Sequence, residues 1–369
     1  MKRVLQYGNF GVGGVQSFIM NIYRNIDREK IQFDFILPHD GGIAYESEIL
    51  DMGGRIFRCI YSKRESIIKH HRSWCDFYEK YSHDFCALHM HMNQIRYYAP
   101  LVYAERCGIK KRIYHSHTSS DMNPSNSIIK KLTEFDTRIN LSRYATDLFA
   151  CSDSAGRYMF GNKKFNVIPN AIETDKFIFN ESVRKKKREE LRLRDKFVIG
   201  TVGHLSYIKN PEFAVEIFNA VHRKNPNSEL IMVGTGMLED KIKQMIADYK
   251  LTDCVQLLGR RYDVPELMQA FDCFLLPSRF EGLGIVYIEA QAAGLPCFAS
   301  EGVVPMEAKV TELMNYIPLD KPAEFWADRI LASHIIERRN MKSEIIKSGY
   351  DIKDLAQKLQ YFYLEKEKM

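Results

Sequence analysis

The stretch Leu275–Phe298, LLPSRFEGLGIVYIEAQAAGLPCF, decides the fold, because it combines a strand end, a loop, a helix and the start of another strand. Phe271–Leu276 is an apolar run of strand length, and the glycines at 282 and 284 provide a flexible backbone from which a helix begins. We expect this helix to end at Gly294, just before a Leu-Pro pair. Repeated alternation of strands and helices predicts an α/β fold with parallel sheets.

The start of this helix is a candidate anion site. A helix N-terminus offers unpaired N–H groups and the positive end of a dipole, so we expect phosphate there. Glu289 follows within the helix, and because side chains lean toward the helix N-terminus it could reach a ribose whose phosphates lie on the loop. Glu281, on the loop itself, would face the group beyond the phosphates. The alternative is an ordinary βαβ turn with two solvated glutamates.

The stretch resembles the signature of retaining glycosyltransferases of family 4, PSxxEGxGxxxxEAxAxGxP, in which two glutamates are separated by seven residues. The resemblance implies the GT-B fold, in which two doubly wound Rossmann-like domains face across a cleft and a C-terminal helix crosses back to the first domain. It also implies roles for particular residues. Glu281 would orient the donor sugar, Glu289 would bind the ribose, and the amides of Gly282, Leu283 and Gly284 would bind the diphosphate.

The implied activity is retaining transfer of a hexosyl or N-acetylhexosaminyl group from a nucleotide diphosphate sugar, expected to be a UDP-sugar. The implied acceptor is a glycan or a lipid-linked sugar in bacterial capsule or exopolysaccharide biosynthesis.

Length and composition agree with two large domains. The chain has 369 residues, 45% of them hydrophobic, and a formal net charge of +6. We expect an N-terminal acceptor-side domain over 1–178, a nucleotide-sugar-binding domain over 179–350, and a final helix over 351–369. No nucleic-acid reader motif occurs, and the scattered cysteines indicate reduced core residues. Glycines interrupt the short apolar piece at the N-terminus, so we expect no signal peptide, and no apolar run of about 18 residues occurs in the sequence. We expect a cytoplasmic protein, at most peripheral on the inner face of a membrane.

The N-terminus predicts a strand at Val4–Tyr7, a glycine loop at 8–14 and a helix at Val15–Asn25. This is a phosphate-loop pattern, although glycines that only allow close packing of strand and helix explain it equally well. Gln16 stands where a third dinucleotide-fingerprint glycine would be, which disfavours a nicotinamide site. The resemblance implies that Gly13 and Gly14 close over the donor diphosphate and the acceptor.

Two His-x-His pairs fall at predicted strand ends, His89 with His91 and His115 with His117. Histidines two apart on a strand point the same way and could hold a metal, but neither pair has a third or fourth ligand at a sensible spacing. A neutral histidine could instead bond a sugar hydroxyl or a phosphate. By the resemblance, His117 is the candidate near the donor sugar and the acceptor hydroxyl, and His115 is the alternative.

Residues 124–148 predict a helix of mixed basic and apolar character. We expect a solvated face over a buried apolar stripe. The alternative is a helix lying on anionic lipid.

The C-terminal half begins after a charged boundary region at 180–196 and repeats the alternation of predicted strands and helices. Lys209, beside a predicted helix start, is well placed to bind a diphosphate. The resemblance implies an arginine where this chain has His204, and it places Arg261 near the nucleotide base. No Asp-x-Asp occurs, so we expect no metal cofactor: Lys209, the loop amides and His204 would stabilise the departing diphosphate.

Two other functions fit the same residues. One is a sugar-nucleotide epimerase, a chemistry that also occurs on GT-B folds. The other is a non-catalytic partner subunit that binds a nucleotide sugar, which the replacement of the expected arginine by His204 makes conceivable.

Overall fold

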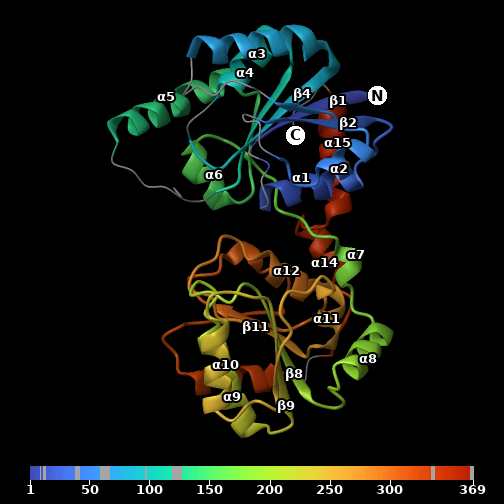
Figure 1. Ribbon diagram of the computed structural model, residues 1–369, viewed down its shortest axis with the longest axis vertical. Helices are drawn as coiled ribbons and strands as arrows, with labels where there is room; N and C mark the ends of the chain where they lie inside the picture. Colours follow the sequence, from blue (N-terminus) through green and yellow to red (C-terminus); the bar gives the residue numbers. More distant parts are fainter. Residues whose placement is uncertain are drawn as a thin grey trace. The chain divides into compact units, whose positions relative to one another are not determined.

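The computed structural model describes residues 1–8, 10, 14–37, 42–58, 67–95, 98–118, 127–333 and 337–365. The chain forms two compact units (Figure 1). The first contains residues 1–171 together with 352–369, and the second contains 172–351. Both are α/β units built on a parallel sheet, as the alternating sequence pattern predicts.

The sheet of the first unit has the strand order β3-β2-β1-β4-β5-β6-β7, and its pairings are parallel. Its central strands are buried on both faces, because helices cover both sides of a doubly wound sheet. The strands are β1 Lys2–Tyr7, β2 Ile31–Leu37, β3 Ile56–Arg58, β4 Phe85–Met92, β5 Lys111–Ser116, β6 Asp147–Ala150 and β7 Asn166–Val167.

Helices pack on this sheet, and the last helix of the chain is one of them. Helix α15 lies beside α1 and contacts β4, with Phe362 and Tyr363 in the core of the unit (Figure 1). The expected return of the C-terminal helix to the first domain is therefore observed. The helices are α1 Gly14–Asn25, α2 Glu46–Asp51, α3 Ile67–Tyr81, η1 Ser82–Asp84, α4 Ala99–Arg106, α5 Ile128–Tyr144, α6 Asp153–Phe160 and α15 Ile352–Leu364.

The second unit has the sheet order β10-β9-β8-β11-β12-β13, also parallel. Its strands are β8 Phe197–Val202, β9 Ser228–Val233, β10 Val255–Leu257, β11 Cys273–Leu276, β12 Cys297–Ser300 and β13 Met314–Ile317. Its helices are α7 Thr174–Phe177, α8 Glu181–Glu190, α9 Pro211–Lys224, α10 Glu239–Asp248, α11 Val264–Ala270, α12 Ile285–Ala292, η2 Met306–Ala308, α13 Ala323–Ala332 and α14 Lys342–Lys347.

The units divide at residues 171 and 172, seven residues before the boundary that the sequence suggested. Ile172 and Phe177 are buried in the core of the second unit, and α7 packs on α11 and α12. The charged segment that the sequence marked as the boundary region includes α8, which packs on α11 within the second unit. Charge density indicated an exposed helix face there, not a linker.

Helix α5 departs from its expected burial. Its stripe of large apolar residues is 58–74% exposed, and consists of Ile128, Ile129, Leu132, Phe135 and Ile139. The buried residues of the helix are Thr137 and Leu141, on another face. The expectation of a buried apolar stripe was therefore wrong, because spacing shows which residues share a helix face but not what covers that face. Among the described helices, none combines the length and the apolar character needed to cross a membrane.

Candidate active site

Two loops of the second unit meet at one edge of its sheet. Residues 203–210 connect β8 to α9, and residues 277–284 connect β11 to α12. Because β8 and β11 are neighbouring parallel strands, their carboxyl ends lie together. Arg279 joins the loops: its N–H donates to the Ile208 carbonyl at 2.7 Å, and its guanidinium donates to the Tyr207 carbonyl at 2.9 Å.

Two of the predicted site residues form an ion pair where these loops meet. Lys209 Nζ lies 2.6 Å from Glu281 Oε1, and the Ser278 hydroxyl donates to the same carboxylate oxygen at 2.8 Å. The Glu281 side chain is 5% exposed and that of Lys209 is 25% exposed. The structure thus places the candidate phosphate clamp and the candidate sugar-orienting carboxylate in direct contact, 72 residues apart in sequence.

The N-terminus of α12 adjoins this ion pair and has free amide groups. Gly284 is the residue before the helix and has a φ of +75°, which strongly favours glycine. Among the described residues, none accepts a hydrogen bond from the N–H groups of residues 282–286. Unpaired amides at a helix start, next to a lysine, form a suitable anion-binding arrangement.

Glu289 lies further along α12, and its burial raises the pKa of its carboxyl to about 7. No described residue forms a hydrogen bond or ion pair with this carboxylate. Glu289 is partly buried, and a carboxyl that is partly removed from water and has no partner is costly to ionise. Strongly shifted groups of this kind are common at functional sites. The Glu289 carboxyl is therefore available to bond a ligand.

His204 and Arg261 differ in their surroundings. His204 is exposed on the loop that also carries Lys209. Arg261 donates two hydrogen bonds to Asp263, at 2.7 and 2.6 Å, and these bonds hold the pKa of Asp263 well below its ordinary value. Asp263 also pairs with Lys187 at 3.0 Å. Arg261 is thus committed to a charged network within the unit, so its predicted role at the base would require another partner for Asp263.

In the first unit, Gly13 lies outside the described residues, and Gly14 is the first residue of α1. The histidine pairs lie on two strands of the same unit: the first pair belongs to β4, and the second lies at the end of β5. Strands β4 and β5 are neighbours, and His91 is directly opposite His115. The two His-x-His pairs therefore form one cluster of four imidazoles, with Phe18 of α1 packed edge-on against His91, His115 and His117.

Hydrogen bonds link this histidine cluster, which consists of His89, His91, His115 and His117. His89 Nε2 lies 3.1 Å from His115 Nδ1, and His91 Nδ1 lies 2.8 Å from His117 Nε2. The Tyr363 hydroxyl lies 2.7 Å from His89 Nδ1. Burial lowers the pKa of all four histidines, to about 3 for His117, so the rings are neutral.

The same cluster offers nitrogen atoms that could hold a metal ion. One ring nitrogen from each of His89, His91 and His115 lies within 4.8 Å of the others. The sequence provided no third or fourth ligand for either His-x-His pair, whereas strand pairing brings both pairs together. Neutral imidazoles are suitable ligands for Zn²⁺.

Sequence reasoning missed several residues that support the candidate site. Ser278 was given no role, although its hydroxyl bonds Glu281. Gln6 was not singled out, although its Oε1 lies 2.8 Å from His91 Nε2. A polar residue inside an apolar strand such as Val4–Tyr7 was the available signal, because buried polar side chains are usually bonded to something.

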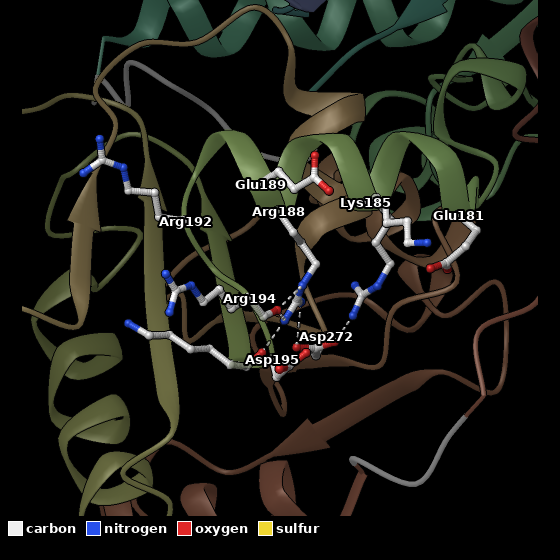
Figure 2. A pocket seen from close by; sticks show the side chains of 10 residues that line it. Glu181, Lys185, Arg188, Glu189, Arg192, Arg194, Asp195 and Asp272 are labelled. Atoms are coloured by element: carbon white, nitrogen blue, oxygen red, sulfur yellow. Dashed lines mark hydrogen bonds and ion pairs between the residues drawn. The ribbon is translucent and has the colours of Figure 1, made fainter.

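A basic cavity of about 1030 Å³ lies at the opposite edge of the second sheet (Figure 2). It is lined by residues of α8 and by Lys196 and Asp272, which directly precede β8 and β11. Arg184 and Arg188 bind Asp272 at 2.6 and 3.3 Å and also donate to main-chain carbonyls. These two arginines tie α8 to the sheet, so their charge is used within the fold.

Comparisons with known proteins bear on the family and the fold of this chain. Residues 183–330 match the family model described as glycosyl transferases group 1. The chain is 30% identical over 363 residues to EpsF of Bacillus subtilis (strain 168), which is provisionally named a glycosyltransferase, with 95% of this chain and 93% of EpsF covered. It is also 37% identical over 142 residues to the UDP-Gal:alpha-D-GlcNAc-diphosphoundecaprenol alpha-1,3-galactosyltransferase of Escherichia coli, covering 37% of this chain and 36% of that enzyme.

Among solved structures, HepE of Anabaena in complex with UDP resembles the chain with a TM-score of 0.66 at 20% identity. The match covers 99% of this chain and 96% of HepE. Together with the two Rossmann-like units, this likeness confirms the predicted GT-B fold.

The raised pKa of Glu289 predicts a pH-dependent stability. Because the folded-state pKa of about 7 lies above the ordinary value of 4.5, the folded chain binds this proton more tightly than the unfolded chain. The free energy of unfolding should therefore fall as the pH rises between these values. Glu289→Gln cannot ionise, so we expect it to exceed wild type by about 3 kcal/mol at pH 8, with the difference vanishing below pH 4.5. Urea unfolding at several pH values measures this.

A matched control is Glu324→Gln. The Glu324 carboxylate binds Arg223 at 2.7 Å and its pKa is lowered, so this change should produce no gain in stability at any pH. Equal stability of wild type and Glu289→Gln at pH 8 would contradict the prediction.

Proposed function

Because the chain belongs to the glycosyl transferases group 1 family, we propose that it transfers a sugar from a UDP-sugar to a lipid-linked saccharide, with retention at the anomeric carbon. The family makes it a glycosyltransferase. The UDP bound by HepE supports the choice of nucleotide. The name of the Escherichia coli relative, a galactosyltransferase acting on a diphosphoundecaprenol-linked sugar, supports the choice of acceptor and a place in polysaccharide assembly.

The observation that carries this proposal is the group of unpaired amides at residues 282–286 beside the Lys209–Glu281 ion pair. A diphosphate carries negative charge and oxygens that accept hydrogen bonds, so it can bind both the unpaired amides and the Lys209 ammonium. As the bond to the sugar breaks, negative charge grows on the departing UDP. Lys209 and the α12 amides are positioned to stabilise it, and the exposed His204 on the same loop is a third candidate. We propose that no metal cofactor is needed for this step.

We propose that donor binding rearranges the ion pair. The diphosphate replaces Glu281 as the partner of Lys209, which leaves the Glu281 carboxylate free to accept hydrogen bonds from hydroxyls of the donor sugar. Ser278 would keep Glu281 in place meanwhile, since its hydroxyl bonds the same oxygen. Glu289 would bond the ribose, and His117 would meet the sugar or the acceptor hydroxyl.

For a lipid-linked acceptor, we propose that α5 meets the membrane. Helix α5 projects from the first unit (Figure 1). Its apolar stripe is exposed, and the exposed Lys131 and Arg143 on the same helix favour anionic lipid. A solvent-facing stripe of five large apolar side chains is unusual for a surface with no partner.

The ion-pair rearrangement predicts different effects for its two partners. Lys209→Ala should lower UDP affinity roughly tenfold or more, because a charge-assisted bond to phosphate is lost. Glu281→Gln should leave UDP affinity equal to or above wild type, because it releases Lys209, yet it should lower transfer at least roughly tenfold. Titration calorimetry measures binding, and mass spectrometry of products from a nucleotide-sugar panel with an undecaprenol-diphosphate-linked GlcNAc acceptor measures transfer in the presence of EDTA.

Each outcome of that assay discriminates between functions. An epimerised nucleotide sugar would indicate an epimerase, and binding without any product would indicate a non-catalytic subunit. Activity that is lost in EDTA and restored by Mg²⁺ would contradict the metal-free step. Loss of UDP affinity in Glu281→Gln would show that Glu281 does not compete for Lys209.

Glu289→Gln should weaken UDP binding roughly tenfold, because the ribose loses a charge-assisted hydrogen bond. The same variant is predicted to be more stable at pH 8, so the weaker binding could not be explained by unfolding. Unchanged calorimetric affinity for UDP would remove Glu289 from the donor site.

Leu132→Ser combined with Phe135→Ser should reduce binding to phosphatidylglycerol vesicles at least roughly tenfold, because apolar burial contributes about 25 cal/mol per Å². Co-sedimentation measures it. The control is Phe325→Ser, which removes an exposed phenylalanine of α13 and should bind vesicles as wild type does. If the double variant also binds as wild type does, α5 is not the docking helix.

A further inference from the structure

The four histidines form two hydrogen-bonded pairs stacked on one another. The rings of His89 and His115 are nearly parallel, with 13° between their planes, and their facing nitrogens are 3.1 Å apart. His91 and His117 form the second pair, at 2.8 Å. The pairs pack against each other with ring centroids 4.2 Å apart for His89 and His91, which are stacked, and 4.1 Å apart for His115 and His117, which are tilted by 31°.

A hydrogen bond between two neutral imidazoles needs one N–H and one bare nitrogen, so the second pair has a direction. Gln6 determines that direction. In this amide orientation its Oε1, which can only accept, lies 2.8 Å from His91 Nε2, while its Nε2 has no partner among the described residues. This orientation puts the His91 proton on Nε2. His91 Nδ1 is then bare and accepts from His117 Nε2–H. His117 Nδ1 is consequently the bare nitrogen at the end of this series of hydrogen bonds.

The surroundings support this arrangement. Gln6 is 1% exposed and His91 is 5% exposed, so water does not compete for their bonds. His117 directly follows β5 and is only partly buried, and no described residue bonds its Nδ1. The rings stay neutral because burial opposes protonation, and mutual repulsion adds to this for His89, His91 and His115. Neutral rings are required, because a protonated histidine has no acceptor nitrogen.

We propose that Gln6 and His91 are positioning residues that hold His117 in its Nε2–H tautomer, so that its bare Nδ1 accepts a hydrogen bond from a sugar hydroxyl. The acceptor role rests on the proposed function, whereas the tautomer does not. Without Gln6, the direction of the His91–His117 bond is no longer determined. His117 would then carry its proton on Nδ1 for part of the time, and a protonated Nδ1 cannot accept a hydrogen bond from a sugar hydroxyl.

A bound metal is the competing arrangement. Zn²⁺ would need bare nitrogens from several rings at about 2.0 Å. In the stacked pairs, each short nitrogen–nitrogen contact instead has room for a single proton. We therefore expect the purified protein to contain no stoichiometric metal in this cluster.

Nitrogen-15 NMR of histidine-labelled protein tests the proposal, because it distinguishes the two neutral tautomers directly. The chain has 11 histidines, and the His117 signals are assigned from their absence in His117→Gln. We expect Nε2–H with bare Nδ1 in wild type, a mixture of tautomers in Gln6→Leu, and restoration of the wild-type tautomer in Gln6→Glu, whose carboxylate also accepts. Gln6→Leu should lower kcat roughly tenfold with little change in donor KM.

The matched control is Gln32→Leu, on neighbouring β2. Gln32 is a buried glutamine that bonds Tyr23 and not the histidine cluster, so its loss should leave the His117 tautomer unchanged. An Nδ1–H tautomer in wild type, an unchanged tautomer in Gln6→Leu, or one equivalent of Zn²⁺ bound to the cluster by elemental analysis would each overturn the proposal. If Gln6→Leu does not fold, the wild-type spectrum still decides. If the spectra show the expected tautomers but no sugar is transferred, only the proposed function is refuted and the tautomer assignment stands.

Discussion

Lys209 and Glu281 can form an ion pair only because β8 and β11 are neighbouring parallel strands. Parallel pairing brings the carboxyl ends of separate βα units to one edge, so the loops that follow them share a small space. Arg279 fixes the two loops by donating to the carbonyls of Tyr207 and Ile208. The remaining features of the second unit's site, the α12 amides and Glu289, follow the same loop and depend on its position. Sheet topology is thus the constraint from which the donor site is built.

The site leaves polar groups without a protein partner at the point where the two loops meet. The amides of residues 282–286 have no acceptor among the described residues, and the Glu289 carboxyl is buried enough to raise its pKa to about 7. Each such group costs stability when it stands alone and gains a bond when a ligand arrives. The basic cavity beside α8 shows the opposite behaviour, because Arg184 and Arg188 are bound to Asp272 and to main-chain carbonyls. The groups beside α12 are therefore available to a ligand, whereas the arginines beside α8 stabilise the fold.

The first unit contains a buried network of hydrogen bonds in which the donor and the acceptor of each bond are set by its neighbour. Gln6 on β1, His91 on β4 and His117 after β5 lie on neighbouring strands, so strand pairing sets their spacing. The network is not fully satisfied, because Gln6 Nε2 and His115 Nε2 are buried without a partner among the described residues, and low dielectric makes such groups expensive. The C-terminal helix joins this region through Tyr363, whose hydroxyl lies 2.7 Å from His89. Helix α15 therefore contacts the histidine cluster that contains the candidate His117.

The sequence alone determined the local elements and the family. The apolar run before Pro277, the glycines at 282 and 284 and the helix that follows predicted β11, its loop and α12, because backbone preferences and periodicity act over a few residues. The roles of Lys209, Glu281, Glu289 and His117 were hypotheses from the same reasoning, and they stay proposals. Only the tertiary structure decided which segments meet. It joined two histidine pairs into one cluster, committed Arg261 to Asp263, moved the boundary to residue 172 and exposed the apolar stripe of α5. A local pattern shows which side chains share a face, but the neighbour that covers that face comes from elsewhere in the chain, and no short-range signal encodes it.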